Sequence, residues 1–438
     1  MSSREIKDTK SRTGASTAID PPLRLPNDIE LVDPARLPDL SELPFFMRKF
    51  VAVASKIHWG SLVMILPDGR AFRFQGLEPG SEGVLHIHDL AFAKRLLRGG
   101  TIGVAESYFE KQWSSPDVTT ILEVVSRNGD HVSAFFNSNF IIRLAQRFLH
   151  FLRKNTTRGA KRNIMAHYDM GNEFYAEWLD PTMTYSAARF NSADQDLSQA
   201  QINKYRSLAE RIDLQPEHHV LEIGSGWGGF AEYAATEIGC RVTGITISPE
   251  QLNFAKERIA NQGLEDKVDF RLQDYRKVEG TFDRIASIEM FEAVGIQYWP
   301  VYFKRLFDCL KPGGLAGLQI ITIADRHFED YKKRTDFIQK YIFPGGMLPS
   351  PTALRAQVEK AGLMWKDNIN FGPDYARTLK TWQARFLEAW PRIQSMGFDE
   401  RFRLLWRYYL AYCEAGFRSG SIDVTQISLT KTDNTLTA

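Results

Sequence analysis

The chain has 438 residues, 43% of them hydrophobic, and a formal net charge of +2. These numbers predict a large core and more than one domain, and the near-neutral charge provides no global field that would attract nucleic acid. The three cysteines (Cys240, Cys309 and Cys413) are far apart and form no C-x-x-C pair. Their spacing argues against a metal site or a disulfide framework and favours reduced thiols in a cytoplasmic protein.

The first 40 residues predict a flexible arm, because they are rich in Ser, Thr, Asp and Pro. The N-terminus is polar and of mixed charge, so we expect no signal peptide. No segment approaches the ~18 apolar residues that would span a bilayer. Any contact with a membrane is therefore expected to be peripheral.

Residues 41–130 predict a small α+β accessory domain. The turn signal Pro67-Asp68-Gly69 separates two apolar runs, which is typical of a hairpin. The predicted elements are strands at 61–66, 70–74 and 83–88, a helix capped by Asp89 that ends at Gly99-Gly100, and a helix from Asp117 to about Arg127.

Residues 131–165 predict a basic amphipathic linker. The segment from 131 to 168 has no acidic side chain, and phenylalanines and leucines alternate with arginines and lysines. This pattern favours a helix on an anionic membrane surface. An interdomain helix with a solvated basic face is the alternative.

Residues 166–431 predict a parallel sheet covered by helices, because strands and helices alternate; residues 432–438 form a tail. Ser248 is predicted to cap a helix that Gly263 closes. The predicted strands are 219–223, 241–245, 268–272, 282–288 and 315–323, with a helix at 230–238 after the first of them.

A glycine-rich turn (Gly224, Ser225, Gly226, Gly228) follows the first of these strands and predicts a cofactor loop. A tight turn without any ligand is the plain alternative. Glu222 before the loop can face a cationic ligand. The loop lacks the Lys-Ser/Thr pair of a P-loop, and the second strand ends without the acidic residue that nicotinamide enzymes use. S-adenosylmethionine (SAM) fits this pattern best.

Several further motifs in fixed order carry a family resemblance. They are 167–175 (HYDMGNEFY), 180–186 (DPTMTYS), the glycine loop, 244–251 (GITISPEQ), 290–295 (MFEAVG) and 341–346 (YIFPGG). From about residue 60 to 430 the chain resembles the cyclopropane fatty acid synthase family of SAM-dependent methyltransferases, which includes the mycolic acid cyclopropane synthases.

The resemblance implies a seven-stranded Rossmann-like methyltransferase sheet with helical lid insertions. It also implies that the N-terminal unit is an accessory domain linked to homodimers and lipid surfaces, at the inner face of the membrane. The cofactor contacts it implies are Tyr185, Ser186, Gly224, Gly226, Thr246, Ile247, Gln251, Tyr275 and Arg276.

In this family, the base is held to be a bicarbonate ion bound by a Cys, a Glu, a His and a Tyr. Glu292 and Tyr375 match two of these ligands. The Cys and His positions correspond to Ala187 and Gln319. An alanine side chain cannot bind an anion, although the Gln319 amide can. The resemblance therefore implies SAM as cofactor and leaves the role of bicarbonate open.

Glu289 lies three residues before Glu292, and a helical turn would place both on one face. Either carboxylate, with a raised pKa, could serve as a direct base; a solvated or ion-paired Glu289 is the alternative. His167 and Cys413 also match functional positions of the family. A structural histidine and a buried packing cysteine are the plain interpretations of these two.

The sequence thus predicts C-methylation of the double bond of an unsaturated acyl chain, within membrane phospholipid. The product is a cyclopropane, or a methyl-branched or methylene chain if the ring does not close. Methylation of another lipophilic substrate, such as a quinone, is a second hypothesis. A lipid-binding scaffold without catalysis is a third, and a nucleic-acid methyltransferase is disfavoured because no base-flipping motif is present.

Overall fold

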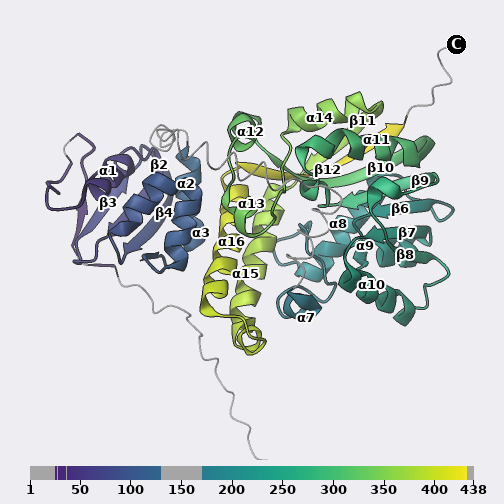
Figure 1. The fold of residues 1–438 in the computed structure, drawn as a ribbon, viewed down its shortest axis with the longest axis horizontal. Helices are drawn as coiled ribbons and strands as arrows, with labels where there is room; N and C mark the ends of the chain where they lie inside the picture. Colours follow the sequence, from purple (N-terminus) through teal and green to yellow (C-terminus); the bar gives the residue numbers. More distant parts are fainter. Residues whose placement is uncertain (1–24, 27, 36, 130–169, 432–438) are drawn as a thin grey trace, which may run out of the picture.

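The computed structural model describes residues 25–26, 28–35, 37–129 and 170–431. Within these ranges the chain forms one sheet of five strands and one of seven. The long helices α15 (Gly372–Ser395) and α16 (Glu400–Arg418) lie between the two sheets (Figure 1). The predicted basic linker and the C-terminal tail lie outside the described residues.

The N-terminal sheet has the strand order β1-β3-β2-β4-β5. Leu62 and Met64 of β2 join the main core that contains the helices, while Val63 and Ile65 belong to a separate small cluster, as the alternation of a strand dictates. The elements are β1 (Ile29–Leu31), α1 (Phe45–Ala54), β2 (Trp59–Ile65), β3 (Ala71–Gln75), β4 (Glu78–Ile87), α2 (Ala91–Phe109), β5 (Trp113–Ser114) and α3 (Val118–Arg127).

Two predictions for this unit are wrong. Residues 29–31, expected within a flexible arm, form an edge strand parallel to β3. Helix α2 does not end at Gly99-Gly100, because Gly100 adopts φ +55° and the helix resumes beyond this kink to Phe109. A glycine can take this conformation at little steric cost. The hairpin and the Asp117 cap are confirmed; Asp117 Oδ1 accepts from the Thr120 N–H at 3.0 Å.

The larger sheet has the order β11-β12-β10-β9-β6-β7-β8, with β12 antiparallel between β10 and β11 and the remaining strands parallel. The predicted strands 219–223, 268–272 and 282–288 are confirmed. The strands are β6 (His219–Ile223), β7 (Arg241–Thr246), β8 (Val268–Leu272), β9 (Phe282–Ile288), β10 (Leu310–Ile323), β11 (Leu363–Asn370) and β12 (Ile422–Lys431).

Helices cover this sheet, and several lie at the end of it where the parallel strands finish. They are α7 (Gly171–Ala176), α8 (Leu197–Arg211), α9 (Gly229–Tyr233), α10 (Pro249–Asn261), α11 (Trp299–Cys309), α12 (Asp325–Tyr331), α13 (Phe337–Tyr341) and α14 (Pro351–Lys360), besides α15 and α16. The predicted helix 230–238 is split, because α9 passes into a π-helical turn at Ala234–Ile238. The Ser248 cap of α10 is confirmed.

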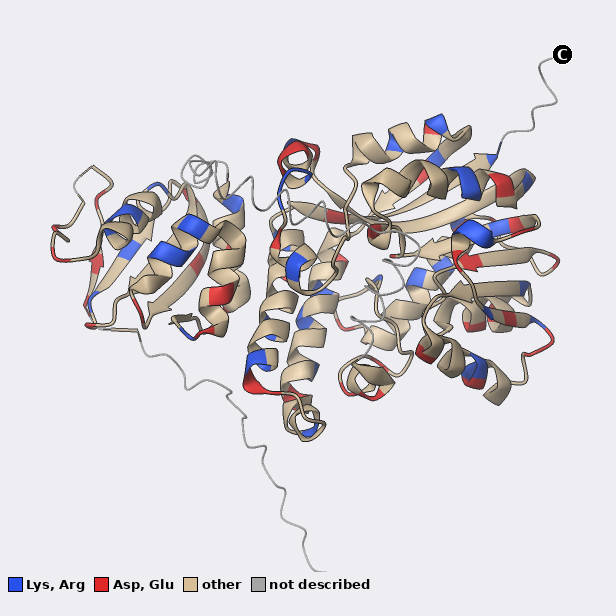
Figure 2. Cartoon of the chain, viewed as in Figure 1, with Lys and Arg blue, Asp and Glu red and all other residues tan. Residues whose placement is uncertain are grey.

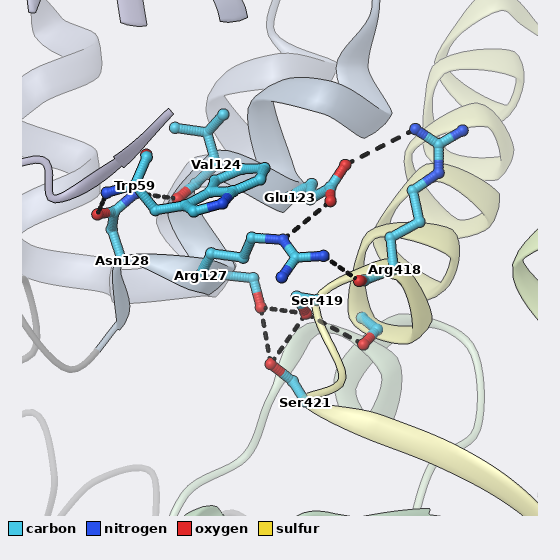
Figure 3. A network of polar contacts seen from close by, with 10 residues as sticks. Trp59, Glu123, Val124, Arg127, Asn128, Arg418, Ser419 and Ser421 are labelled. Atoms are coloured by element: carbon cyan, nitrogen blue, oxygen red, sulfur yellow. Dashed lines mark hydrogen bonds and ion pairs between the residues drawn. The ribbon is translucent and has the colours of Figure 1, made fainter. Parts of the chain in front are cut away.

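A polar network joins α3 of the N-terminal unit to the end of α16 (Figure 3). Arg127 donates to Glu123 Oε1 at 3.0 Å and to the carbonyl oxygen of Arg418 at 2.5 Å. The Ser126 hydroxyl lies 2.8 Å from the hydroxyls of both Ser419 and Ser421. These contacts fix α16, which lines the cavity described below, against the N-terminal unit.

Candidate active site

A cavity of about 910 Å³ begins at the glycine loop after β6 and continues along α16 into the N-terminal unit. Its walls are mostly apolar and include Phe417 and Tyr412 of α16, and Leu122 and Leu85 of the N-terminal unit. A cavity of this size and polarity is typical of a site for a lipophilic small molecule. Two groups of polar side chains in its walls lie near the glycine loop and near the end of β9.

The glycine loop turns sharply at the end of β6. Gly224, Gly226 and Gly228 all have positive φ, at +84°, +53° and +86°. A Cβ at Gly224 would lie 2.6 Å from Met290 Cγ, so the backbone there must remain bare. The N–H groups of Gly224 and Ser225 both donate to the carbonyl oxygen of Ile245 at 3.0 Å. The loop therefore has a fixed shape at the cavity wall.

Glu222 and Ser225 make this end of the cavity suitable for a cation with hydrogen-bonding groups. Glu222 Oε2 and Ser225 Oγ are buried and have no hydrogen-bond partner among the described residues. Burial raises the pKa of Glu222 to about 8, although the charges of Lys204 and Arg258 act in the opposite direction. A carboxylate in this state is stabilised by a bound cation. The amino and sulfonium groups of SAM provide that charge, so the residues present fit this cofactor.

The other predicted cofactor residues surround this end of the cavity. Gln251 Oε1 accepts from the Thr246 hydroxyl at 3.0 Å, and the Tyr185 hydroxyl lies 2.6 Å from that of Tyr409. Those that line the cavity are Tyr185, Ser186, Glu222, Gly224, Ser225, Gly226, Thr246, Ile247, Gln251, Tyr275 and Arg276. Gly228 does not line the cavity in this structure; it is the left-handed N-cap of α9.

Glu289 is the centre of a hydrogen-bond network at the end of β9. Its Oε1 accepts from the Ala187 N–H at 2.8 Å and from Gln319 Nε2 at 2.7 Å, and its Oε2 accepts from the Tyr375 hydroxyl at 2.7 Å. Burial raises the pKa of Glu289, while these three hydrogen bonds and the charge of Lys204 oppose the rise. The carboxylate is thus fixed at the cavity wall with both oxygens bound.

Glu292 also lines the cavity close to Glu289 and is half-buried, yet its surroundings are poorer in donors. Its Oε1 accepts from the Ile321 N–H at 2.5 Å, and Oε2 has no partner among the described residues. Burial and the charge of Glu289 raise the pKa of Glu292 to about 8. Because Glu289 has three donors and Glu292 one, hydrogen bonding favours the negative charge of this pair on Glu289.

The predicted helix face shared by the two glutamates is wrong. Glu289 follows β9 with φ +48°, and the chain turns into a short 3-10 helix at Phe291–Ala293. The two carboxylates are neighbours because the strand end bends, and Glu289 contacts residues from three distant segments. A left-handed non-glycine residue is uncommon and is often found at functional sites.

The residues at the family's anion site do not fit an external bicarbonate. Ala187 offers its backbone N–H, and Gln319 and Tyr375 offer an amide and a hydroxyl, but all three donors already bind the Glu289 carboxylate. Gln319 Nε2 also donates to the Ala187 carbonyl oxygen at 3.3 Å. An anion placed here would lack these donors and would face a buried carboxylate.

Two further predicted catalytic residues are less informative. His167 lies outside the described residues. Cys413 lines the cavity, and burial raises the pKa of its thiol far above the usual value. A thiol that stays protonated is a poor nucleophile, in keeping with a packing role.

Lys204 is a site residue that the sequence analysis missed. It is fully buried on α8, and its Nζ donates to Ser186 Oγ at 2.7 Å. The signal was present: Lys204 shares the buried face of α8 with Leu197, Gln201 and Leu208, and a lysine on the inner face of an amphipathic helix is unusual. Gln426, also missed, links the Lys204 carbonyl oxygen to Gln319 Oε1 by two hydrogen bonds of 3.0 Å.

The described residues were searched for membrane-spanning helices and for metal sites. Their helices include none that is both long and apolar enough to cross a bilayer. Their His, Cys, Asp and Glu side chains form no group of three or more that could hold a metal ion.

Known proteins are similar to this chain in sequence. The family model for mycolic acid cyclopropane synthetase matches residues 155–427. The tuberculostearic acid methyltransferase UfaA1 of Mycobacterium tuberculosis is 39% identical over 358 residues, which cover 77% of this chain and 81% of that protein. The cyclopropane-fatty-acyl-phospholipid synthase of Escherichia coli K12 is 37% identical over 350 residues, or 78% of this chain and 86% of that protein.

A solved structure is also similar. The mycolic acid cyclopropane synthase CmaA1, complexed with S-adenosylhomocysteine (SAH) and CTAB, matches with a TM-score of 0.58 and 30% identity. The match covers 62% of this chain and 98% of that one. From the family model and these relatives, the chain belongs to the mycolic acid cyclopropane synthase family and is a SAM-dependent methyltransferase that modifies lipids.

Proposed function

We propose that this enzyme methylates the double bond of an unsaturated fatty acyl chain in membrane phospholipid, with Glu289 as the proton acceptor. The observation that carries the proposal is the Glu289 carboxylate, fixed by three hydrogen bonds in the wall of a largely apolar cavity. The relatives named for tuberculostearic acid and for fatty-acyl-phospholipid support the substrate class.

The glycine-loop end of the cavity would hold the donor. Glu222 would bind the amino group and Ser225 would contribute its hydroxyl, since both have unused hydrogen-bonding capacity. Thr246 ends β7 and Gln251 lies in the first turn of α10, and both would contact the nucleoside part. When bound, SAM supplies an electrophilic methyl group.

The remaining part of the cavity would hold the acyl chain. A carbon–carbon double bond is a weak nucleophile, so its position relative to the donor determines the rate. Attack on the methyl group leaves a cation on the acyl chain. The aromatic faces of Tyr185, Tyr375 and Tyr409 line the cavity and can stabilise this cation, while the apolar walls exclude water that would trap it.

Glu289 completes the reaction by accepting a proton from the acyl cation. The C–H bond breaks, the proton joins a Glu289 oxygen, and the electron pair forms a new carbon–carbon bond. If the proton leaves the added methyl group, a cyclopropane closes; if it leaves a neighbouring carbon, an alkene or methylene group forms. The hydrogen bonds from Tyr375, Gln319 and Ala187 orient the carboxylate for this step.

A basic surface on the N-terminal unit supports docking on an anionic membrane. Helix α1 and the first half of α2 pack together and carry exposed cations without any acidic residue, seen as blue bands in Figure 2. Leu97, Arg98, Gly99 and Gly100, at the kink of α2, line the cavity. The exposed cations are Arg48, Lys49, Lys94, Arg95 and Arg98. The enzyme would therefore bind peripherally, with one end of its cavity beside the lipid.

The test uses purified full-length protein, SAM and vesicles of monounsaturated phosphatidylglycerol. We expect SAH to form in step with phospholipid that has gained one CH2 unit, and nuclear magnetic resonance of the product distinguishes a cyclopropane from a methylene group. Binding to vesicles should weaken with salt. A quinone that is methylated while the lipid stays unchanged would contradict the proposal.

A further inference from the structure

A buried cation lies between the two polar parts of the cavity and has no part in the mechanism above. Lys204 is fully buried; its Nζ donates to Ser186 Oγ at 2.7 Å and lies 4.2 Å from the ring centroid of Tyr205. The next residue after Ser186 is Ala187, whose N–H binds Glu289 at 2.8 Å. The ammonium group is thus joined to the base through two consecutive residues.

The charges of three carboxylates act on this ammonium group. They are Glu222 of β6, Glu289 after β9 and Asp180 after α7, and all three act to raise the pKa of Lys204. Burial opposes them more strongly and lowers that pKa to about 7. Gln319 on β10 and Gln426 on β12 are neutral amides in the same network. Arg258 of α10, whose charge also acts on Glu222, ion-pairs with Glu232.

We propose that Lys204 is a positioning residue that balances the charge of Glu289 in the free enzyme and releases its proton when the cationic donor binds. The reason is electrostatic. The donor's sulfonium and amino groups bring positive charge to Glu222, and like charges in a buried site repel strongly. Removing the Lys204 proton is the least costly relief, because this ammonium is already destabilised by burial.

The proposal extends to turnover, and that part rests on the proposed function. Methyl transfer changes the cationic donor into neutral-sulfur SAH and leaves the positive charge on the acyl chain. The C–H bond of that cation then breaks and the proton joins Glu289. The Glu289 proton then leaves to solvent. When neutral-sulfur SAH departs, the repulsion ends and Lys204 takes up a proton from solvent. Each turnover therefore releases one net proton, the one taken from the acyl chain, and the charges balance.

Calorimetry of ligand binding to the full-length protein, without lipid, tests the inference. Titrations in buffers of different ionisation enthalpy give the number of protons released. We expect SAM to release up to about one proton more than SAH at pH values below 7. With a lysine pKa near 7, the affinity for SAM should rise about tenfold from pH 6 to pH 8, and the affinity for SAH should rise much less.

Variants show which residue releases the proton when SAM binds. Lys204→Met should lose the additional release, because it has no ammonium group, and Lys204→Arg should bind SAM weakly at every pH, because arginine keeps its charge. Glu222→Gln removes the other titrating group at the donor site and should retain the lysine-dependent part. Retained binding of SAH shows that a variant is folded. If Lys204→Met does not fold, the difference in proton release between SAM and SAH in the unsubstituted enzyme still tests the proposal.

Two results would overturn the inference. Equal proton release with SAM and SAH, or the same additional release in Lys204→Met, shows that Lys204 keeps its proton. Methylated lipid together with equal release would contradict the role of Lys204 and leave the proposed function intact. Lysine-dependent proton release without lipid methylation would contradict the proposed function and leave the role of Lys204 in donor binding intact.

Discussion

The two polar parts of the cavity hold their carboxylates in opposite ways. Glu222, at the donor end, has an oxygen without a hydrogen-bond partner among the described residues, whereas Glu289, at the base end, has both oxygens bound. A buried carboxylate with an unused oxygen is stabilised by a cationic ligand. A carboxylate whose oxygens are both hydrogen-bonded is already oriented and needs no additional ion. Glu222 is therefore suited to binding a cation, and Glu289 is suited to accepting a proton.

Glu289→Gln should separate the functions of the two ends of the cavity most strongly. The amide cannot accept a proton, so we expect turnover to fall by about 10²–10⁴-fold, the range for loss of a general base. The affinity for SAM at pH 8, where Lys204 is already mostly neutral, should change little, because the donor end is untouched. Rates with monounsaturated vesicles and calorimetry with SAM measure both quantities.

Glu292→Gln is the matched control, because the two glutamates lie three residues apart and both line the cavity. Glu292 has a pKa raised to about 8 and is mostly protonated at neutral pH, so an amide is a close substitute. We expect a loss of turnover below about tenfold. A loss as large as that of Glu289→Gln would show that the two carboxylates act together.

Gly224→Ala should break the donor end instead. The added Cβ would approach Met290 Cγ to 2.6 Å at a residue with φ +84°. We expect the affinity for SAM to fall by at least about tenfold through displacement of the loop. Gly263→Ala is the control, since Gly263 also has a positive φ (+65°) but open space around its Cβ position. If both variants bind SAM normally, the loop is not the donor site.

Tyr375→Phe should raise the pKa of the base, Glu289. The Tyr375 hydroxyl lowers the pKa of Glu289, so its removal raises that pKa. Because the carboxylate form is active, turnover increases with pH through this pKa, and the acidic limb of the pH–rate profile should move to higher pH. We expect a loss of about tenfold at neutral pH, recovered in part at higher pH. An unchanged acidic limb would contradict the role of this hydrogen bond.

Arg127→Ala should have the smallest effect. It removes the bonds from Arg127 to Glu123 and to the Arg418 carbonyl oxygen (Figure 3). Partly exposed contacts of this kind contribute about 1 kcal/mol, so we expect a small drop in melting temperature and nearly normal affinity for SAM. Thermal unfolding with and without SAM measures it. A large loss of SAM binding would show that the N-terminal unit supports the donor end directly.

The donor end could be predicted from the sequence, while the base end could be predicted only in part. The residues from Glu222 to Gly226 are consecutive and end a strand, so a local pattern identified them. The Glu289 network joins Ala187, Gln319 and Tyr375 from separate elements, and no local pattern shows which of them meet. Glu289 was recognised as a candidate base, but the predicted helix face was wrong because the chain bends at a positive φ.

The fold could likewise be predicted where local patterns are clear and not where packing decides. Strands with clear apolar runs, such as 219–223 and 282–288, were predicted with their observed ends. The continuation of α2 beyond Gly100 was not, because packing of the second half of the helix outweighs the local stop signal. Lys204 was missed although it lies on the inner face of an amphipathic helix, because the pattern alone does not show that β10 and β12 pack against α8.

The central claim is that the protein's own Glu289 carboxylate accepts the proton during methylation of an acyl double bond. The most direct measurement is mass spectrometry of monounsaturated phospholipid vesicles after incubation with SAM in buffer depleted of bicarbonate. The account predicts SAH and lipid with one added CH2 unit at an undiminished rate, and almost none with Glu289→Gln. Loss of activity on depletion, restored by added bicarbonate, would contradict it.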